Sequence, residues 1–191
     1  MEVRGQQLKT FAAAPPNMRV VWEMTAAHGD KKYLVYEDES YTYAEVHAQV
    51  RKLAQYLVDQ GVTRGDRVAI STRNYPEWVV TYWACVSLGV ACVGMNAWWT
   101  PVEMDYALGD SEPKVLIVDD ERLERYNQVP TKRDIHVISV RSDRPLPPGG
   151  IRWADVMAKS DPGVLPPAEI DPDDDATIFY TSGTTGFPKG A

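Results

Sequence analysis

The stretch DRVAISTRNYPEWVVTYWACVSLGVACVGM, residues 66–95, decides the fold class of the chain. It begins with the β-prone run DRVAIS, continues into an apolar segment that starts at Pro76, and ends with the uninterrupted apolar run VACVGM. Proline suits the first turn of a helix, and a continuous apolar run is typical of a strand buried on both faces. The stretch therefore predicts a strand, a helix and a second strand, which is the repeating unit of a parallel sheet.

The same alternation continues on both sides of this stretch. Upstream, Thr42 and Glu45 have the spacing of a helix-capping box, and apolar residues from Val46 to Val58 recur at helical intervals until Gly61. A short helix over 17–28 and a hairpin over 32–43 are expected before it. The remaining expected elements are a helix over 100–111, strands over 114–121 and 136–140, a short helix within 151–160, and a strand over 176–182.

These patterns predict an α/β fold, a parallel sheet with flanking helices. We expect an N-terminal α/β subdomain over residues 1–140 and a connection rich in Pro, Gly and Asp over 141–175, with one short helix. Residues 176–191 are expected to form a strand and a glycine-rich loop that open the next subdomain, so that the fold is incomplete within this chain.

Charge and cysteine content narrow the function classes. The formal net charge is −7, which argues against a nucleic-acid-binding protein because such proteins carry a basic face. The two cysteines, Cys85 and Cys92, lie among apolar residues without Cys-x-x-Cys spacing, so we expect them in the core of a protein from a reducing, cytoplasmic setting. No apolar run has signal-peptide or membrane-spanning character. Peripheral membrane association stays open, and the sequence indicates no oligomeric state.

The segment YTSGTTGFPKG, residues 180–190, carries the clearest chemistry. Its glycines let the main chain approach a ligand closely, and successive backbone N–H groups in such a turn can converge on an anion. Four hydroxyl groups and a lysine add further donors, and lysine is a common phosphate ligand. The residues that this pattern offers to phosphate are Thr181, Ser182, Gly183, Thr184, Thr185, Gly186 and Lys189.

The spacing excludes the Walker phosphate loop. That loop needs Gly, four residues and then Gly-Lys-Ser/Thr, with the lysine opening a helix. Here Pro188 precedes Lys189 and Gly190 follows it, so a helix through this segment is not expected. The alternative is a flexible surface loop, because Gly, Ser and Thr clusters often form one. A preceding strand, paired glycines and a Pro-Lys-Gly ending together favour a phosphate-binding loop.

YTSGTTGFPKG resembles the signature phosphate loop of the adenylate-forming superfamily, which includes acyl-CoA synthetases, luciferases and the adenylation domains of peptide synthetases. Residues 41–71 and 83–120 resemble two other conserved blocks of the same family, in the same order. Trp98 and Trp99 depart from the family pattern, since many relatives carry smaller or less aromatic residues there. They are candidates for a special contact, although packing is the simpler interpretation.

The resemblance implies an enzyme that uses ATP and Mg²⁺ to convert a carboxylic acid into an acyl-adenylate and then transfers the acyl group to coenzyme A. It implies that the seven loop residues named above bind phosphate and that Thr181 neighbours the metal. It also places the catalytic residues beyond this segment, so we expect the N-terminal part of a longer enzyme that is inactive alone. A fatty acid is the preferred substrate. An amino-acid adenylation domain and a non-catalytic nucleotide-binding fragment are the alternatives.

Other candidates have ordinary explanations. The acidic run DPDDD at 171–175 lacks the glycine and distal glutamate of a calcium loop, and we expect a solvated linker. His28, His47 and His136 share no pattern that indicates catalysis. His47 lies off the apolar stripe of its helix, which predicts an exposed side chain.

Overall fold

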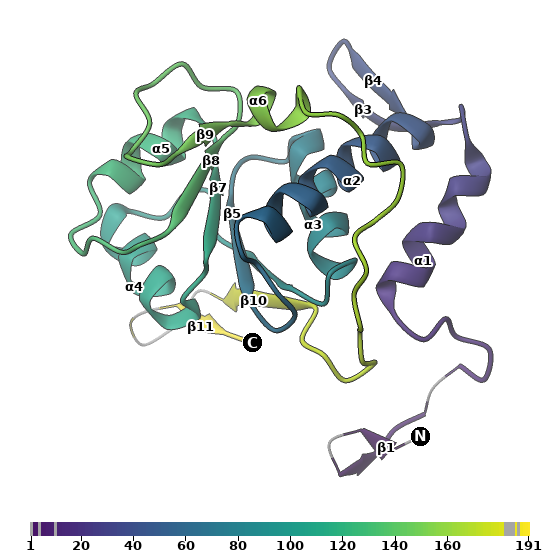
Figure 1. Ribbon diagram of the computed structural model, residues 1–191. Coiled ribbons are helices and arrows are strands. Elements are labelled where there is room, and N and C mark those ends of the chain that lie inside the picture. The colour runs from purple at the N-terminus through teal and green to yellow at the C-terminus, as the bar shows by residue number, and fades with distance from the viewer. Residues whose placement is uncertain (1, 4, 10, 182–185, 187) are drawn as a thin grey trace.

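A computed structural model describes residues 2–3, 5–9, 11–181, 186 and 188–191. Within these residues a central sheet has the strand order β11-β10-β6-β5-β7-β8-β9 (Figure 1). All neighbouring strands pair in parallel except β11, which pairs antiparallel with β10. The strands of this sheet are β5 (Arg67–Ser71), β6 (Ala91–Gly94), β7 (Val115–Val118), β8 (His136–Ser139), β9 (Ile151–Arg152), β10 (Thr177–Thr181) and β11 (Lys189–Gly190).

Helices cover both faces of this sheet and bury one apolar cluster on each. On one face lie α2 (Tyr43–Asp59), α3 (Pro76–Val86) and α6 (Trp153–Met157), and on the other lie α4 (Pro101–Ser111) and α5 (Asp120–Asn127) (Figure 1). Alternate residues of each strand point to opposite clusters, as the pleat requires: Ile117 belongs to the first and Leu116 to the second. The predicted α/β class is confirmed.

The helix ends have the chemistry that the sequence indicates. Thr42 and Glu45 form the expected capping box at the start of α2, and Thr100 forms a second one with Glu103 at the start of α4. At the end of α2, Gly61 takes a φ of 77° while its N–H donates to Val58 and the next N–H donates to Leu57. This is a Schellman motif, which needs the left-handed conformation that glycine adopts readily.

The N-terminal elements pack beside α2 and α3. They are α1 (Met18–Met24), the 3₁₀ helix η1 (Thr25–His28), and the antiparallel hairpin of β3 (Lys32–Tyr36) and β4 (Glu39–Thr42). A further small hairpin, β1 (Glu2–Val3) and β2 (Gln6–Gln7), lies away from the sheet (Figure 1). The predicted helix and hairpin of this region are therefore confirmed.

The expectation of an exposed His47 is wrong. Only 7% of its surface is accessible, because Trp22 of α1 packs against the imidazole. The two rings stack with their centroids 3.9 Å apart, and His47 Nε2 lies 2.9 Å from the Thr25 hydroxyl. A neighbouring helix covers this side of α2, and periodicity within α2 alone does not reveal that contact.

The cysteines lie in the core, as predicted. Cys85 on α3 and Cys92 on β6 are both buried. A hydrogen bond to Cys92, together with burial, raises the pKa of the Cys85 thiol. A protonated, inaccessible thiol is a poor nucleophile, so Cys85 acts as a small apolar group, and Cys92 packs in the same apolar cluster.

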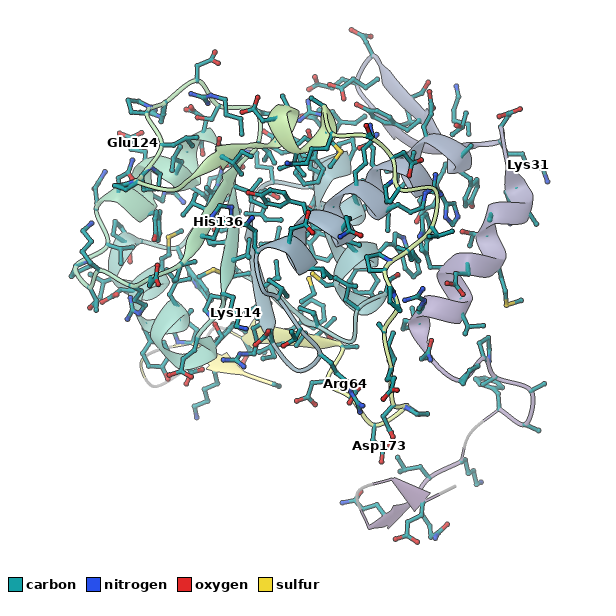
Figure 2. All side chains as sticks on the ribbon, viewed as in Figure 1. Lys31, Arg64, Lys114, Glu124, His136 and Asp173 are labelled. Atoms are coloured by element: carbon teal, nitrogen blue, oxygen red, sulfur yellow. The ribbon has the colours of Figure 1, made fainter. Side chains whose placement is uncertain are left out.

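The segment after α6 returns along the α2–α3 face and brings β10 beside β6 (Figure 1). Two ion pairs hold it: Arg51 to Asp161 at 2.5 Å and Arg64 to Asp174 at 2.7 Å. Figure 2 shows Arg64 where the segment carrying Asp173 turns back toward the sheet. The acidic run 171–175 thus belongs to a surface connection, and β10 extends the sheet built by residues 67–152. The proposed subdomain boundaries stay a prediction.

Among the helices of the described residues, none combines the length and apolar character that crossing a bilayer requires.

Candidate functional site

The carboxyl ends of the parallel strands meet at one edge of the sheet, and the chain changes direction there. From β5 the chain passes through α3 to β6 on one side, and from β6 it crosses back through α4 to β7 on the other side. The switch in strand order lies between β5 and β7. Ligands of open α/β sheets bind outside the carboxyl ends of the strands at such a point, so this edge is where a site is expected.

The glycine-rich segment reaches the same edge through the β10–β11 hairpin. Thr181 pairs with Lys189, and Tyr180 pairs with Gly190. Reciprocal backbone hydrogen bonds of 2.9 Å between Phe179 and Ala191 extend the pairing by one step. Thr181 and Lys189 are both exposed, on facing strands. The hairpin therefore brings together a hydroxyl and an ammonium group from opposite ends of the predicted phosphate loop.

The described residues fix the flanks of that loop. Ser182, Gly183, Thr184 and Thr185 lie outside the described residues, so their assignment to phosphate stays a prediction. Gly186 has a φ of 141°, which side chains rarely adopt. Lys189 lies in a strand, so it does not open a helix as a Walker lysine does. The expectation that no helix begins at this lysine is confirmed.

Tyr180 joins the hairpin to α4. Its hydroxyl donates to Asp110 Oδ2 at 2.7 Å, and its ring meets Trp99 edge-on with the centroids 5.5 Å apart. Burial and this hydrogen bond to Asp110 raise the pKa of Tyr180, so the phenol stays protonated and remains a donor. The spacing of the motif did not indicate this contact, because Asp110 lies far away in the sequence.

A second polar cluster spans the switch point itself. Asp119, which follows β7, accepts hydrogen bonds from the backbone N–H of Arg73 at 2.9 Å and from the Arg122 guanidinium at 3.1 Å. The Arg122 side chain is 1% exposed and also donates to the Ala97 carbonyl at 2.8 Å. Its Nη2 has no hydrogen-bond partner among the described residues. Asp119 thus ties together the loops after β5 and β7.

Trp98 and Trp99 have different environments. Trp99 is 6% exposed and packs on Tyr180, whereas Trp98 is 70% exposed. The Arg73 guanidinium lies 5.1 Å from the Trp98 ring centroid, a cation–π arrangement. Packing therefore accounts for Trp99, and Trp98 presents its ring at the switch point.

No metal site is built into the described part of the chain. Within it, no three or more His, Cys, Asp or Glu side chains are arranged to hold a metal ion. The placement of a metal beside Thr181 stays a prediction.

Residues 21–191 match the model of the AMP-binding enzyme family. The chain belongs to this family. A medium/long-chain-fatty-acid–CoA/3-oxocholest-4-en-26-oate–CoA ligase of Mycobacterium marinum is 32% identical over 169 residues, which cover 84% of this chain and 30% of that protein. An acetyl-coenzyme A synthetase of Vibrio parahaemolyticus is 31% identical, over 86% of this chain and 29% of that protein.

Solved structures agree with the family and the fold. The anthranilate CoA ligase AuaEII, in complex with anthranoyl-AMP, superimposes with a TM-score of 0.82 at 28% identity, covering 93% of this chain and 35% of that one. A fatty acyl CoA synthetase of Mycobacterium tuberculosis gives a TM-score of 0.74 at 24% identity, which supports the fold alone. The chain spans about 30% of the length of the curated relatives that it matches.

Proposed function

We propose that this chain supplies the nucleotide-phosphate site of an AMP-forming acid–thiol ligase, which activates a carboxylic acid as an acyl-adenylate and transfers the acyl group to coenzyme A. The observation that carries the proposal is the β10–β11 hairpin, which holds Thr181 opposite Lys189 at the two ends of the family's glycine-rich segment. Because the chain spans about 30% of its relatives' length, the proposal assigns the complete reaction to a longer protein.

Charge is the physical obstacle in this reaction. A carboxylate must attack the α-phosphorus of a polyanion, and pyrophosphate must leave with its charge balanced. Positioning and fixed donors supply most of the catalysis in such transfers. In the proposal, Lys189 and the hydroxyls of Thr181, Ser182, Thr184 and Thr185 hold the β- and γ-phosphates, and the backbone at Gly183 and Gly186 approaches them closely. Thr181 would lie beside a bound Mg²⁺, which would neutralise further phosphate charge.

The preferred acid is a fatty or other hydrophobic acid. A relative that covers 84% of this chain is named for medium- and long-chain fatty acids, and other relatives are named for 4-coumarate and acetate. These names agree on coenzyme A as the thiol partner. They favour an acyl-CoA ligase over the alternative of an amino-acid adenylation domain.

The test compares Lys189→Ala with Lys132→Ala in the longer protein, using acid-dependent exchange of pyrophosphate into ATP. Removing one preorganised donor to a developing charge costs about 100-fold in rate, so Lys189→Ala should lose about that much. Lys132 is exposed near the amino end of β8, at the opposite edge of the sheet, and its replacement should leave the rate unchanged. Equal rates for the two variants would overturn the assignment of Lys189.

A titration of the 191-residue chain with Mg·ATP tests whether this chain binds nucleotide by itself, which the alternative of a non-catalytic nucleotide-binding fragment also requires. Binding that Lys189→Ala abolishes supports a working phosphate site in this chain. Binding that survives the substitution contradicts the site.

A further inference from the structure

The Tyr180 side chain lies under both strands of the β10–β11 hairpin. Ile178 and Tyr180 of β10 point toward the apolar cluster that α4 covers. On the neighbouring strand, a Cβ added to Gly190 would lie 3.1 Å from the Tyr180 ring and 3.2 Å from Ile178. The backbone of β11 therefore rests directly on this ring, and a side chain at Gly190 would push it away. The Tyr180 ring thus sets the distance of both β10 and β11 from the apolar cluster that α4 covers.

The hydroxyl of Tyr180 ties this unit to a rigid element. It donates to the Asp110 carboxylate at 2.7 Å and lies 3.5 Å from the Ala107 carbonyl, both on α4. The helix is itself fixed, because Met104 and Leu108 are completely buried against the sheet. A hydrogen bond to an ionised acceptor is shorter and stronger than a neutral one. The hairpin is therefore fixed in two ways: β10 pairs with β6, and the Tyr180 hydroxyl bonds to α4.

The pair that flanks the glycine-rich segment comes one residue later. Thr181 and Lys189 are the next register step after Tyr180 and Gly190. A tilt of the hairpin would therefore displace the Thr181 hydroxyl and the Lys189 ammonium from the site that they share. β11 lies at the edge of the sheet, so no further strand restrains it among the described residues.

We propose that Tyr180 is a positioning residue for phosphate binding: through Asp110 and the backbone of Gly190 it holds Thr181 and Lys189 where nucleotide phosphate meets them. This inference rests on the proposed function of the hairpin. It assigns to Tyr180 a role distinct from core packing, because the hydroxyl, and not the ring alone, sets the position.

Tyr180→Phe tests the hydroxyl while keeping the ring on Gly190. The matched control is Tyr126→Phe, which removes a phenol that packs against the same apolar cluster from α5. The first measurement is amide hydrogen exchange in the 191-residue chain. We expect exchange at Thr181 and Lys189 to rise roughly tenfold in Tyr180→Phe, as for the loss of one charge-assisted hydrogen bond, and to stay unchanged in Tyr126→Phe.

The second measurement is the affinity for Mg·ATP, in a double-mutant cycle with Asp110→Ala. Each single variant should weaken binding roughly 5- to 10-fold. The double variant should be no weaker than either, because both changes remove one interaction. Thermal unfolding should stay close to that of Tyr126→Phe, which separates positioning from a general loss of stability.

The outcomes distinguish the inference from the function on which it rests. Unchanged exchange at the hairpin in Tyr180→Phe, or fully additive losses in the cycle, would overturn the positioning role. A wild-type chain that binds no Mg·ATP would contradict the proposed function, and the exchange comparison would then still decide whether the hydroxyl fixes the hairpin. Gly190→Ala provides a second route, because it displaces the ring and should raise the same exchange rates while Tyr180 keeps its hydroxyl.

Discussion

Asp119 and Arg122 lie in the polar run DDERLER, which reads as solvated surface, yet their side chains are only 4% and 1% exposed. They are buried because Asp119 follows β7 directly and caps α5, which turns both side chains toward the loops after β5 and β6. Removing one partner of a buried pair leaves the other charge without compensation. Their burial makes this pair a determinant of the shape of the carboxyl edge.

Asp119→Ala should therefore lower the free energy of unfolding by about 3 kcal/mol. The loss has two sources. The buried Arg122 guanidinium loses its buried partner and keeps only the half-exposed Glu121 as a counter-charge, and the N–H groups of Arg73 and Arg122 lose their acceptor. Glu124→Ala is the control, since Glu124 lies on the same helix as Arg122 and pairs with Arg144 but is half exposed; it should change stability by less than about 1 kcal/mol. Chemical denaturation measures both, and similar losses would contradict the buried pair.

His47 gives the chain a dependence on pH near neutrality. Burial, and then the nearby charge of Arg51, lower the pKa of His47 from its ordinary value near 6.5. The unfolded chain therefore binds more protons below about pH 6.5, and stability should be complete above pH 7 and fall as the solution is acidified through that value. His47→Gln should make this decline shallower and leave the part due to His136, whose pKa is also lowered by burial, whereas His28→Gln, at an exposed position, should not. Parallel slopes for the two variants would show that His47 is not buried as a neutral ring.

At the scale of the elements, local signals predicted most of the fold. The capping box at Thr42 and the apolar runs at 66–71 and 90–95 specify elements through their own residues, and each forms as expected. The helix α5 was missed because its sequence DERLERYN contributes one fully buried apolar residue, Leu123. Its position is set by the Asp119 cap and by packing. The strand predicted over 114–121 is wrong at its end, because β7 stops at Val118 and α5 begins at Asp120. No apolar pattern in the sequence marks that helix start.

The candidate site divides in a similar way. The residue types of segment 180–190 indicate an anion ligand by themselves, so sequence alone predicts Thr181 and Lys189 as phosphate ligands. Tyr180–Asp110 and Arg73–Asp119 join residues 70 and 46 positions apart. Such contacts depend on how α4 and β7 are placed in the sheet, which the motif does not encode.

The end of α4 offers a test of backbone strain. Glu112 caps this helix with a φ of 44° and a ψ of 59°, the left-handed conformation that costs a side-chain-bearing residue about 1 kcal/mol. Glu112→Gly should raise the free energy of unfolding by about that amount. Glu112→Ala removes the same side chain, including its 3.7 Å ion pair with Arg67, but keeps the strain. A glycine variant no more stable than the alanine variant would contradict this explanation.

At the scale of the whole molecule, Arg141 joins parts that are distant in sequence. It follows β8 and donates to Glu39 of the β3–β4 hairpin at 2.8 Å and to Glu77 of α3 at 2.9 Å. Its guanidinium also lies 4.9 Å from the ring centroid of Tyr75, which precedes α3. The Arg141 side chain therefore joins the β3–β4 hairpin and the start of α3 to the carboxyl end of β8.

Arg141→Ala should release the hairpin and lower the free energy of unfolding by about 1–2 kcal/mol, since its hydrogen bonds to carboxylates are partly exposed to solvent.

The Arg141→Ala variant should also alter the response of stability to acid. The Arg141 and Tyr41 hydrogen bonds lower the pKa of Glu39 from 4.5 to about 2, so their stabilisation is complete above pH 4.5 and is lost as the pH falls toward 2. Unfolding followed from pH 6 to pH 2 should show a shallower decline in Arg141→Ala than in wild type. Arg125→Ala is the control, because Arg125 donates to the carbonyls of Ala97 and Trp99 and not to a carboxylate, and its acid response should match wild type. If Arg141→Ala also matched wild type, the hairpin would be held by its apolar contacts with α2 and α3 alone.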